Sequence, residues 1–280
     1  MERPPVQVLP ETELLSCIAV FGGCYNNYLA LEATIADARR RGAQALFCLG
    51  DMGGFGPYPD RVFPLLWKNE VFCIQGNYDH SIGNRLNDCA CGYTDPRDNY
   101  YAQISYDYTF THTSELYKDW LRDLAPQCRF TFANRRLLLV HGSPRRVNEF
   151  LWESTSPDRF LIKLLDDYEA DVLLCTHTGI QWKRELPDGR LVVNVGAIGR
   201  PPNDGKTTVW YALLTALPRE QLTDPYLMCE LLPVAYDYER LAADMREEKL
   251  PEEFIETIVS GWWTTCLEIL PHKERSRGRY

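Results

Sequence analysis

Four polar side chains in this sequence are of types that bind a divalent metal ion, and each stands where an apolar run ends. They are Asp51, Asn77, His141 and His177. One carboxylate, one amide oxygen and two imidazoles form a donor set that suits manganese, iron or zinc. A single histidine at the end of a strand is more often structural. Four such groups on one rim of one sheet indicate a metal site.

The loop around Asp51 could bring the backbone close to a ligand. The apolar run 45–49 ends just before this carboxylate, and Gly53, Gly54 and Gly56 follow it. Glycine allows close approach of the backbone, and open α/β sheets bind ligands at the carboxyl ends of their strands. Taken alone, the stretch fits equally well an ordinary strand-to-helix turn that is capped by Asp51.

The elements that would position these residues repeat in the order strand, loop, helix. Apolar runs predict strands at 16–21, 45–49, 71–75, 137–141 and 172–175. Apolar residues at helical spacing predict helices at 27–41, 59–69 and 157–168. Strands that alternate with helices are typical of a parallel sheet, which predicts an α/β fold with the candidate ligands on one rim.

The pattern changes after residue 180. Alternating segments at 181–185, 190–195, 207–215 and 227–233 predict antiparallel strands, and helices are expected at 236–245 and 251–259. Residues 81–127 show no strand pattern and are expected to form a helical insertion. We therefore expect one domain over residues 16–261, with an N-terminal tail at 1–15 and a C-terminal tail at 262–280.

Composition and charge narrow the possible functions. The 280 residues carry a formal net charge of -9, which argues against a nucleic-acid surface built on positive charge. No apolar run is long enough to span a membrane, and the N-terminus lacks the apolar core of a signal peptide, so a cytoplasmic protein with no membrane partner is expected. Cys89 and Cys91 give only a weak zinc signal, and no disulfide framework is expected.

The order and spacing of the motifs resemble the calcineurin-like metallophosphoesterase superfamily, specifically its small bacterial and archaeal phosphodiesterase-type branch. The matching blocks lie within residues 16–261, at 27–32, 50–51, 56–59, 76–79, 141–144, 176–178 and 194–201. The resemblance implies a four-layer αββα sandwich in which two cations clamp a phosphate ester. It also implies that Asp51 bridges the cations, that Asn77, His141 and His177 complete the shell of the second one, and that residues 194–200 shape the phosphate side.

The sequence departs from the family pattern at the first metal. The family has an aspartate and a histidine where this chain has Gly23 and Tyr25, and a second histidine where it has Gly179. A glycine side chain cannot bind a metal, whereas Tyr25 could be a ligand or could fill the vacated space. The family's histidine that is thought to protonate the leaving group is replaced by Tyr78, a weaker acid at neutral pH.

One metal shell is thus complete and the other nearly absent, a pattern that favours a retained single metal over a decayed site. The first hypothesis is an atypical phosphoesterase-like hydrolase with one Mn, Fe or Zn ion, acting on a small phosphate-containing or other metal-coordinating substrate. The second is a catalytically silent relative that binds a phosphate-containing ligand or a protein. The third, suggested by Cys24, is another reaction class on the same mononuclear site.

The first hypothesis assigns roles to residues around the metal. The expected catalytic residues, which would surround the substrate, are Tyr25, Tyr78 and Asp79. The expected substrate-binding residues are Cys24, Asn27 and Arg200. For Cys24, the alternative is a packed thiol at the end of a strand. For Tyr25 and Tyr78, it is that both rings only fill space.

Overall fold

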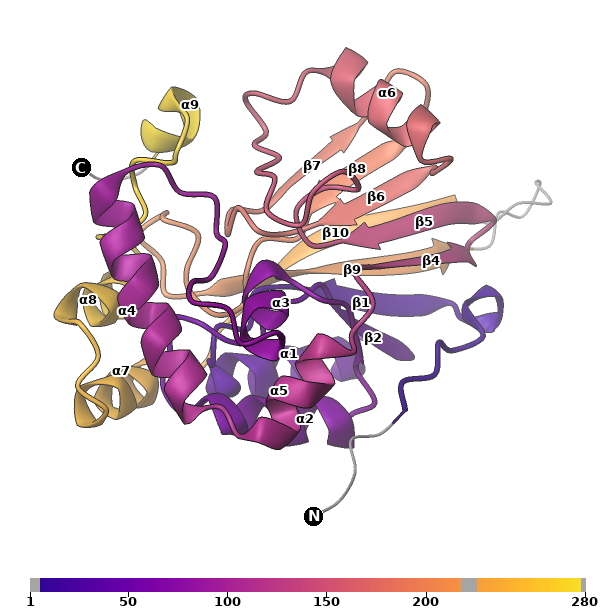
Figure 1. Cartoon of the computed structure of the whole chain (residues 1–280). Coiled ribbons are helices and arrows are strands. Elements are labelled where there is room, and N and C mark those ends of the chain that lie inside the picture. Colours follow the sequence, from indigo (N-terminus) through magenta and orange to yellow (C-terminus); the bar gives the residue numbers. More distant parts are fainter. Residues whose placement is uncertain (1–5, 218–225, 278–280) are drawn as a thin grey trace.

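The computed structural model describes residues 6–217 and 226–277. Two five-stranded sheets pack face to face, and helices cover their outer faces (Figure 1), so the chain has the predicted four-layer α/β sandwich. The first sheet has the strand order β10-β9-β1-β2-β3 and the second β4-β5-β6-β8-β7. The strands are β1 (Cys17–Phe21), β2 (Ala45–Cys48), β3 (Phe72–Cys73), β4 (Gln127–Phe132), β5 (Arg135–Val140), β6 (Val172–Cys175), β7 (Trp182–Glu185), β8 (Leu191–Asn194), β9 (Val209–Leu217) and β10 (Tyr226–Val234).

Helices α1, α2, α3 and α5 lie on the side of the first sheet, and α6 covers the second sheet (Figure 1). The helices are α1 (Tyr28–Arg40), α2 (Val62–Lys68), α3 (Asn77–Gly83), α4 (Pro96–His112), α5 (Glu115–Arg122), α6 (Asp158–Asp167), α7 (Tyr238–Glu247), α8 (Glu252–Ser260) and α9 (His272–Arg275), with short 3-10 turns at Thr12–Leu14 and Pro59–Arg61. In the described part of the chain, none of them combines the length and hydropathy needed to cross a membrane.

Strand β1 shows why the inner strands appear in the sequence as unbroken runs of apolar residues. Its side chains alternate between two cores, because successive residues of a strand point to opposite faces. Ile18 and Val20 pack in the core between the sheets, whereas Ala19 and Phe21 pack against the helices with Leu31 of α1. A strand that is covered on both faces carries no polar positions, which made this part of the fold predictable.

Strand β4 was not predicted from the sequence, which suggested no strand between residues 75 and 137. It pairs antiparallel with β5 across a tight turn at Ala133 and Asn134, both of which have positive φ angles. Its side chains are partly exposed because it lies at the edge of the second sheet, so its apolar signal is weak. Strand β8 also differs from the expectation, since it runs parallel to β6 and antiparallel only to β7.

Both predicted tails pack against the domain. Near the N-terminus, Gln7 exchanges two hydrogen bonds with the backbone of Cys73 on edge strand β3. After α8, Trp263 and Leu270 are buried against Trp152. The prediction of a C-terminal tail at 262–280 is therefore wrong for residues 262–277, because their apolar side chains are buried in the fold. Residues 1–5 and 278–280 lie outside the described residues.

The predicted insertion contains α4 and α5, and its long helix α4 runs beside the C-terminal helices α7 and α8 (Figure 1). Two tyrosine hydroxyls of α4 join these elements: Tyr101 donates to Glu253 at 2.6 Å and Tyr108 donates to Glu248 at 2.7 Å. Helix α4 is thereby held against α7 and α8, close to the rim where β2 ends.

Candidate metal centre and adjoining cavity

Three of the predicted ligands converge where the two sheets meet. Asp51 follows β2 of the first sheet, whereas His141 and His177 follow β5 and β6 of the second. The Asp51 Oδ2 atom lies 3.2 Å from His141 Nε2, which lies 3.1 Å from His177 Nδ1. One donor atom from each residue lies within 4.8 Å of the others, and all three side chains are buried. This cluster can hold a metal ion.

The backbone at this cluster is held in an uncommon conformation. Asp51 and His177 have φ angles of 54° and 65°, in the left-handed region that residues with a Cβ rarely adopt. Such a conformation persists only where the surrounding structure enforces it, and it is concentrated at functional sites. At Asp51 the enforcing contacts include a hydrogen bond from the Tyr25 N–H to the Asp51 carbonyl at 3.1 Å.

Neighbouring groups orient the candidate ligands. His141 Nδ1 lies 2.7 Å from the Leu49 carbonyl oxygen, so Nδ1 carries the hydrogen and Nε2 keeps its lone pair for a metal. Asn77 Nδ2 donates to the Cys89 carbonyl at 2.8 Å, which fixes the amide. Its Oδ1 atom is buried and has no hydrogen-bond partner among the described residues, and the same holds for His177 Nε2.

Buried polar atoms without a partner are rare, so these two atoms support a missing ligand at the cluster. Both Asn77 and His177 line the same cavity as Asp51. Burial, together with the nearby His141, lowers the pKa of His177 to about 3, which keeps its imidazole neutral as metal binding requires. The donor set of two imidazoles, a carboxylate and an amide oxygen therefore fits a divalent transition metal.

Asp79, expected to be catalytic, holds the loop that carries Asp51. Its Oδ2 accepts hydrogen bonds from the N–H groups of Asp51 and Gly76, both at 2.7 Å, and its Oδ1 accepts one from Met52 at 3.0 Å. Burial and the nearby Asp51 raise the pKa of Asp79 to about 7. A Cβ at position 76 would lie 2.3 Å from Asp51 Oδ1, so only glycine allows this close approach. The structure gives Asp79 a positioning role.

Aromatic side chains occupy the side of the site where the first metal's ligands are missing. A Cβ at Gly23 would lie 2.8 Å from Tyr25 Cζ and 3.0 Å from its hydroxyl oxygen. A Cβ at Gly179 would lie 3.2 Å from the ring of Trp263 and 3.6 Å from Arg200 Nη2. The glycines at these positions are thus matched to the large side chains that pack against them.

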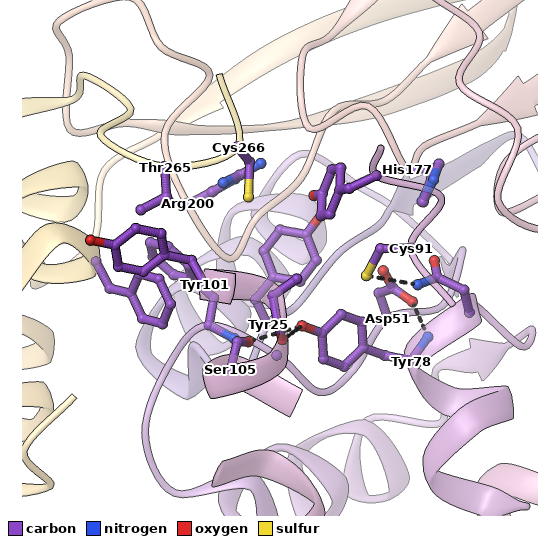
Figure 2. Close-up of a pocket in the computed structure, with 16 residues that line it drawn as sticks. Tyr25, Asp51, Tyr78, Cys91, Tyr101, Ser105, His177, Arg200, Thr265 and Cys266 are labelled. Atoms are coloured by element: carbon purple, nitrogen blue, oxygen red, sulfur yellow. Dashed lines mark hydrogen bonds between the residues drawn. The ribbon is translucent and has the colours of Figure 1, made fainter. Parts of the chain in front are cut away.

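Tyr78 points its hydroxyl away from the metal cluster. The hydroxyl donates to Ser105 Oγ at 3.0 Å, as Figure 2 shows, whereas the Tyr78 backbone N–H donates to Asp51 Oδ1 at 3.0 Å. Burial raises the pKa of Tyr78 well above its ordinary value. Burial also raises the pKa of Tyr25, an effect that nearby Arg200 opposes. Neither phenol is therefore suited to donate a proton at neutral pH.

Two of the three expected substrate-binding residues have structural contacts instead. Cys24 is buried with its sulfur 3.8 Å from that of Cys48, and burial raises its pKa. Asn27 caps α1 by accepting from the Ala30 N–H at 2.9 Å, and its amide donates to the Gly199 carbonyl at 3.1 Å. Neither residue is among those that line the cavity, whereas Arg200 is.

The cavity beside the cluster has walls that sequence reasoning missed. It contains six aromatic side chains, of which only Tyr25 and Tyr78 were expected. Gly54 belongs to the loop that was expected to approach a ligand, and the unexpected lining residues are Phe55, Cys91, Tyr93, Tyr101, Ala102, Ser105, Phe254, Thr265 and Cys266. They come from the glycine loop, α4 and the residues before it, α8 and the C-terminal segment. The apolar run that starts at Trp262 and Trp263 was the available signal that this segment is not a solvated tail.

The loop before α4 carries a disulfide that the sequence did not predict. Cys89 and Cys91 are bonded to each other, since the loop brings their Cα atoms to 5.2 Å. Asn77 Nδ2 lies 3.4 Å from the Cys91 sulfur and donates to it. The disulfide therefore contacts the amide of a candidate metal ligand.

Comparisons with known proteins agree with this geometry. Residues 17–216 match the calcineurin-like phosphoesterase superfamily domain. An uncharacterised protein of Methanocaldococcus jannaschii is 23% identical over 88% of this chain and 98% of its own length. A hypothetical protein from Pyrococcus horikoshii has a solved structure with a TM-score of 0.71, 24% identity, and coverage of 89% of this chain and 100% of that one.

A metallophosphoesterase from Sphaerobacter thermophilus has the same fold, with a TM-score of 0.65, 22% identity, and coverage of 88% of this chain and 99% of that one. At these identities the structural matches establish the fold alone. The family match extends over most of the sandwich, including β2, β5 and β6 and the three residues that end them. The chain belongs to the calcineurin-like phosphoesterase superfamily.

Proposed function

We propose that this protein is a metal-dependent phosphoesterase-like hydrolase that works with one divalent cation. The observation that carries the proposal is the contrast between the two halves of the site. Asp51, His141 and His177 present converging donor atoms, whereas Tyr25 and Trp263 fill the space beside Gly23 and Gly179. One metal can be held by Asp51, His141 and His177. The half of the site that would hold the family's first metal lacks both ligands and room.

The residues of the chain prepare the site in three ways. Asp51, His141, His177 and the Asn77 amide oxygen would hold the cation. Asp79 fixes the loop that carries Asp51, and the Leu49 carbonyl fixes the tautomer of His141. A bound Mn, Fe or Zn ion would polarise a phosphoryl oxygen and lower the pKa of a water. The cavity beside this position, lined largely by aromatic side chains, provides a place for the substrate.

Activity on generic phosphodiesters should be weak. Two-metal hydrolases stabilise the transition state with both cations, and loss of one electrostatic stabiliser typically costs about 100- to 1000-fold in rate. The hydroxyl of Tyr78, which replaces the expected acid, is engaged with Ser105. The missing acid removes a further factor of about 100. The natural substrate must therefore bring a good leaving group or its own charge partners.

Metal analysis combined with a hydrolysis assay tests the proposal. Purified protein would be loaded separately with manganese, iron and zinc, and the bound metal counted by mass spectrometry. We expect about one equivalent per chain, and turnover of p-nitrophenyl phosphate that EDTA abolishes. Two equivalents at this rim, or no metal under any loading condition, would contradict the single-metal site.

A relative that binds a phosphate-containing ligand without hydrolysing it is the alternative. The observation that favours it is Tyr78, whose hydroxyl faces Ser105 where the family pattern has a histidine acid. One equivalent of bound metal without turnover of any phosphate ester would support this alternative. The third hypothesis, another reaction class that uses Cys24, has no geometric support, because Cys24 is buried outside the cavity.

A further inference from the structure

Arg200 is a buried cation that has no carboxylate counter-ion among the residues that the structure describes. Its side chain is only 6% exposed, and its Nε atom has no hydrogen-bond partner in the described residues. The titratable groups that act on the pKa of Arg200 are Cys266, which also hydrogen-bonds its side chain, Tyr93 and Tyr25, and none of these is a carboxylate. A buried charge is normally paired, because removing it from water without compensation is costly. Arg200 therefore has no anionic partner among the described residues, and a bound anion would supply one.

Aromatic rings hold the guanidinium in place. Its Cζ atom lies 3.7 Å from the ring centroid of Trp263, 5.6 Å from that of Phe55 and 5.9 Å from that of Tyr25. Stacking on a ring face stabilises the cation but leaves its N–H groups, which lie in the guanidinium plane, free for an acceptor. Because Arg200 lines the cavity, an incoming ligand can reach these N–H groups.

Arg200 and the metal cluster share this cavity. Figure 2 shows Arg200 beside Thr265 and Cys266 on one side, with Asp51 and His177 on the other. A Cβ at Gly179, two residues after His177, would lie 3.6 Å from Arg200 Nη2. The guanidinium thus lies next to a position where the family pattern has a metal-binding histidine. A fixed positive charge of the chain occupies the side that lacks metal ligands.

We propose that Arg200 binds the phosphate of the substrate in place of the first cation, and that the substrate is a phosphate monoester. The choice of phosphate rests on the proposed function. A guanidinium presents paired N–H donors that match two oxygens of a phosphate. A monoester carries close to two negative charges near neutral pH, one for each of the two cationic centres, whereas a diester carries one.

The charges on the cavity wall support a dianion. One divalent cation held by a single carboxylate, Asp51, leaves one positive charge, and Arg200 adds a second. Asp79 lies behind Asp51, and its oxygens accept hydrogen bonds from three backbone N–H groups, so it does not compete for the guanidinium. Because Arg200 takes the place of the first metal, we expect the site to prefer phosphate monoesters to diesters.

Calorimetric titration with inorganic phosphate and with dimethyl phosphate at pH 8 tests this inference. The protein is used both manganese-loaded and EDTA-treated. Inorganic phosphate should bind the wild type at least about 10-fold more tightly than dimethyl phosphate. Arg200→Met should weaken phosphate binding about 10- to 100-fold in both forms, because charge-assisted hydrogen bonds are lost. Arg200→Lys should give an intermediate loss, because it keeps the charge but not the planar fork.

A matched control is Arg61→Met. The Arg61 guanidinium also stacks on a tyrosine, 3.9 Å from the ring centroid of Tyr58, but its side chain is 46% exposed and outside the cavity. This variant should bind phosphate as the wild type does. Arg200→Met should also melt at the wild-type temperature or above it, because an unpaired buried charge has been removed.

Three results would overturn the inference: no phosphate binding by either form of the wild type, phosphate affinity of Arg200→Met within about two-fold of the wild type, or a melting temperature of Arg200→Met lower by more than about 5 °C. The last would show that the guanidinium is structural. The EDTA-treated arm separates this inference from the proposed function. Arg200-dependent phosphate binding by a protein that takes up no metal under any loading condition would retain the inference and reject the metal-dependent hydrolase.

Discussion

The ring of Tyr25 lies against Gly23 so closely that any side chain at position 23 would collide with it. A Cβ there would lie 2.8 Å from Tyr25 Cζ, a contact that real Cβ atoms do not make. Gly23 also has a φ angle of 54°. The ring of Tyr25 therefore leaves no room for the aspartate that the family pattern has at position 23.

Gly23→Asp should lower the free energy of unfolding by more than backbone strain explains. Its left-handed φ angle costs about 1–2 kcal/mol, and the clash with Tyr25 should add about 1–3 kcal/mol. Gly42→Asp is the matched control, because Gly42 also has a left-handed φ angle but no atom within 4 Å of the place that a Cβ would take. Urea denaturation of both variants isolates the clash. Equal losses would show that Tyr25 moves aside at little cost.

His141→Ala should abolish metal binding. The change removes the Nε2 atom that lies 3.2 Å from Asp51 and 3.1 Å from His177. It also leaves the Leu49 carbonyl without its donor, so the metal-free protein should lose about 1–3 kcal/mol of stability. The His141 side chain is buried, so its truncation affects the fold as well as the candidate metal site.

His112→Ala is the control for that experiment, since His112 is exposed on α4. Metal content by mass spectrometry should drop to background for His141→Ala and stay at the wild-type value for His112→Ala. Full occupancy in a folded His141→Ala protein would show that this residue is not a ligand.

Tyr78→Phe should change stability more than activity. Its hydroxyl donates to Ser105, and losing this hydrogen bond should cost about 0.5–1.5 kcal/mol. Tyr106→Phe is a matched control that removes a donor to the Leu86 carbonyl at 2.6 Å from the same region. Both variants should keep turnover within about three-fold of the wild type. A loss near 100-fold in Tyr78→Phe alone would restore Tyr78 as the proton donor.

The fold could be predicted where a strand is buried on both faces and therefore contains few polar residues. Strands β1, β2, β5 and β6 are largely covered on both faces, so each appears in the sequence mainly as an apolar run. Strand β4 could not be found in this way, because one face is partly exposed at the edge of its sheet. The packing of Trp263 and Leu270 was missed because residues 262–280 were expected to form a tail outside the domain.

The sequence named the candidate ligands, whereas it did not indicate the walls of the cavity. Asp51 lies beside His141 and His177 because the carboxyl end of β2 in one sheet meets those of β5 and β6 in the other, whereas the sequence predicted a single rim of one sheet. The cavity depends on contacts between distant segments, such as Phe55 and Phe254, whose ring centroids are 4.7 Å apart. Such a contact leaves no periodic pattern in the sequence, so the pocket around Arg200 could be recognised only in the structure.

Trp263→Ala should weaken both the fold and the anion site. Trp263 is buried, its indole N–H donates to the Pro201 carbonyl at 2.6 Å, and its ring carries the Arg200 guanidinium. Truncating a buried tryptophan typically costs about 3–5 kcal/mol, and a guanidinium without its platform should bind phosphate more weakly. Trp262→Ala, at the partly exposed neighbouring residue, should cost less stability and preserve phosphate affinity. Denaturation and calorimetry on both variants measure the two effects, and equal losses of phosphate affinity would mean that the stacking on Trp263 does not position Arg200.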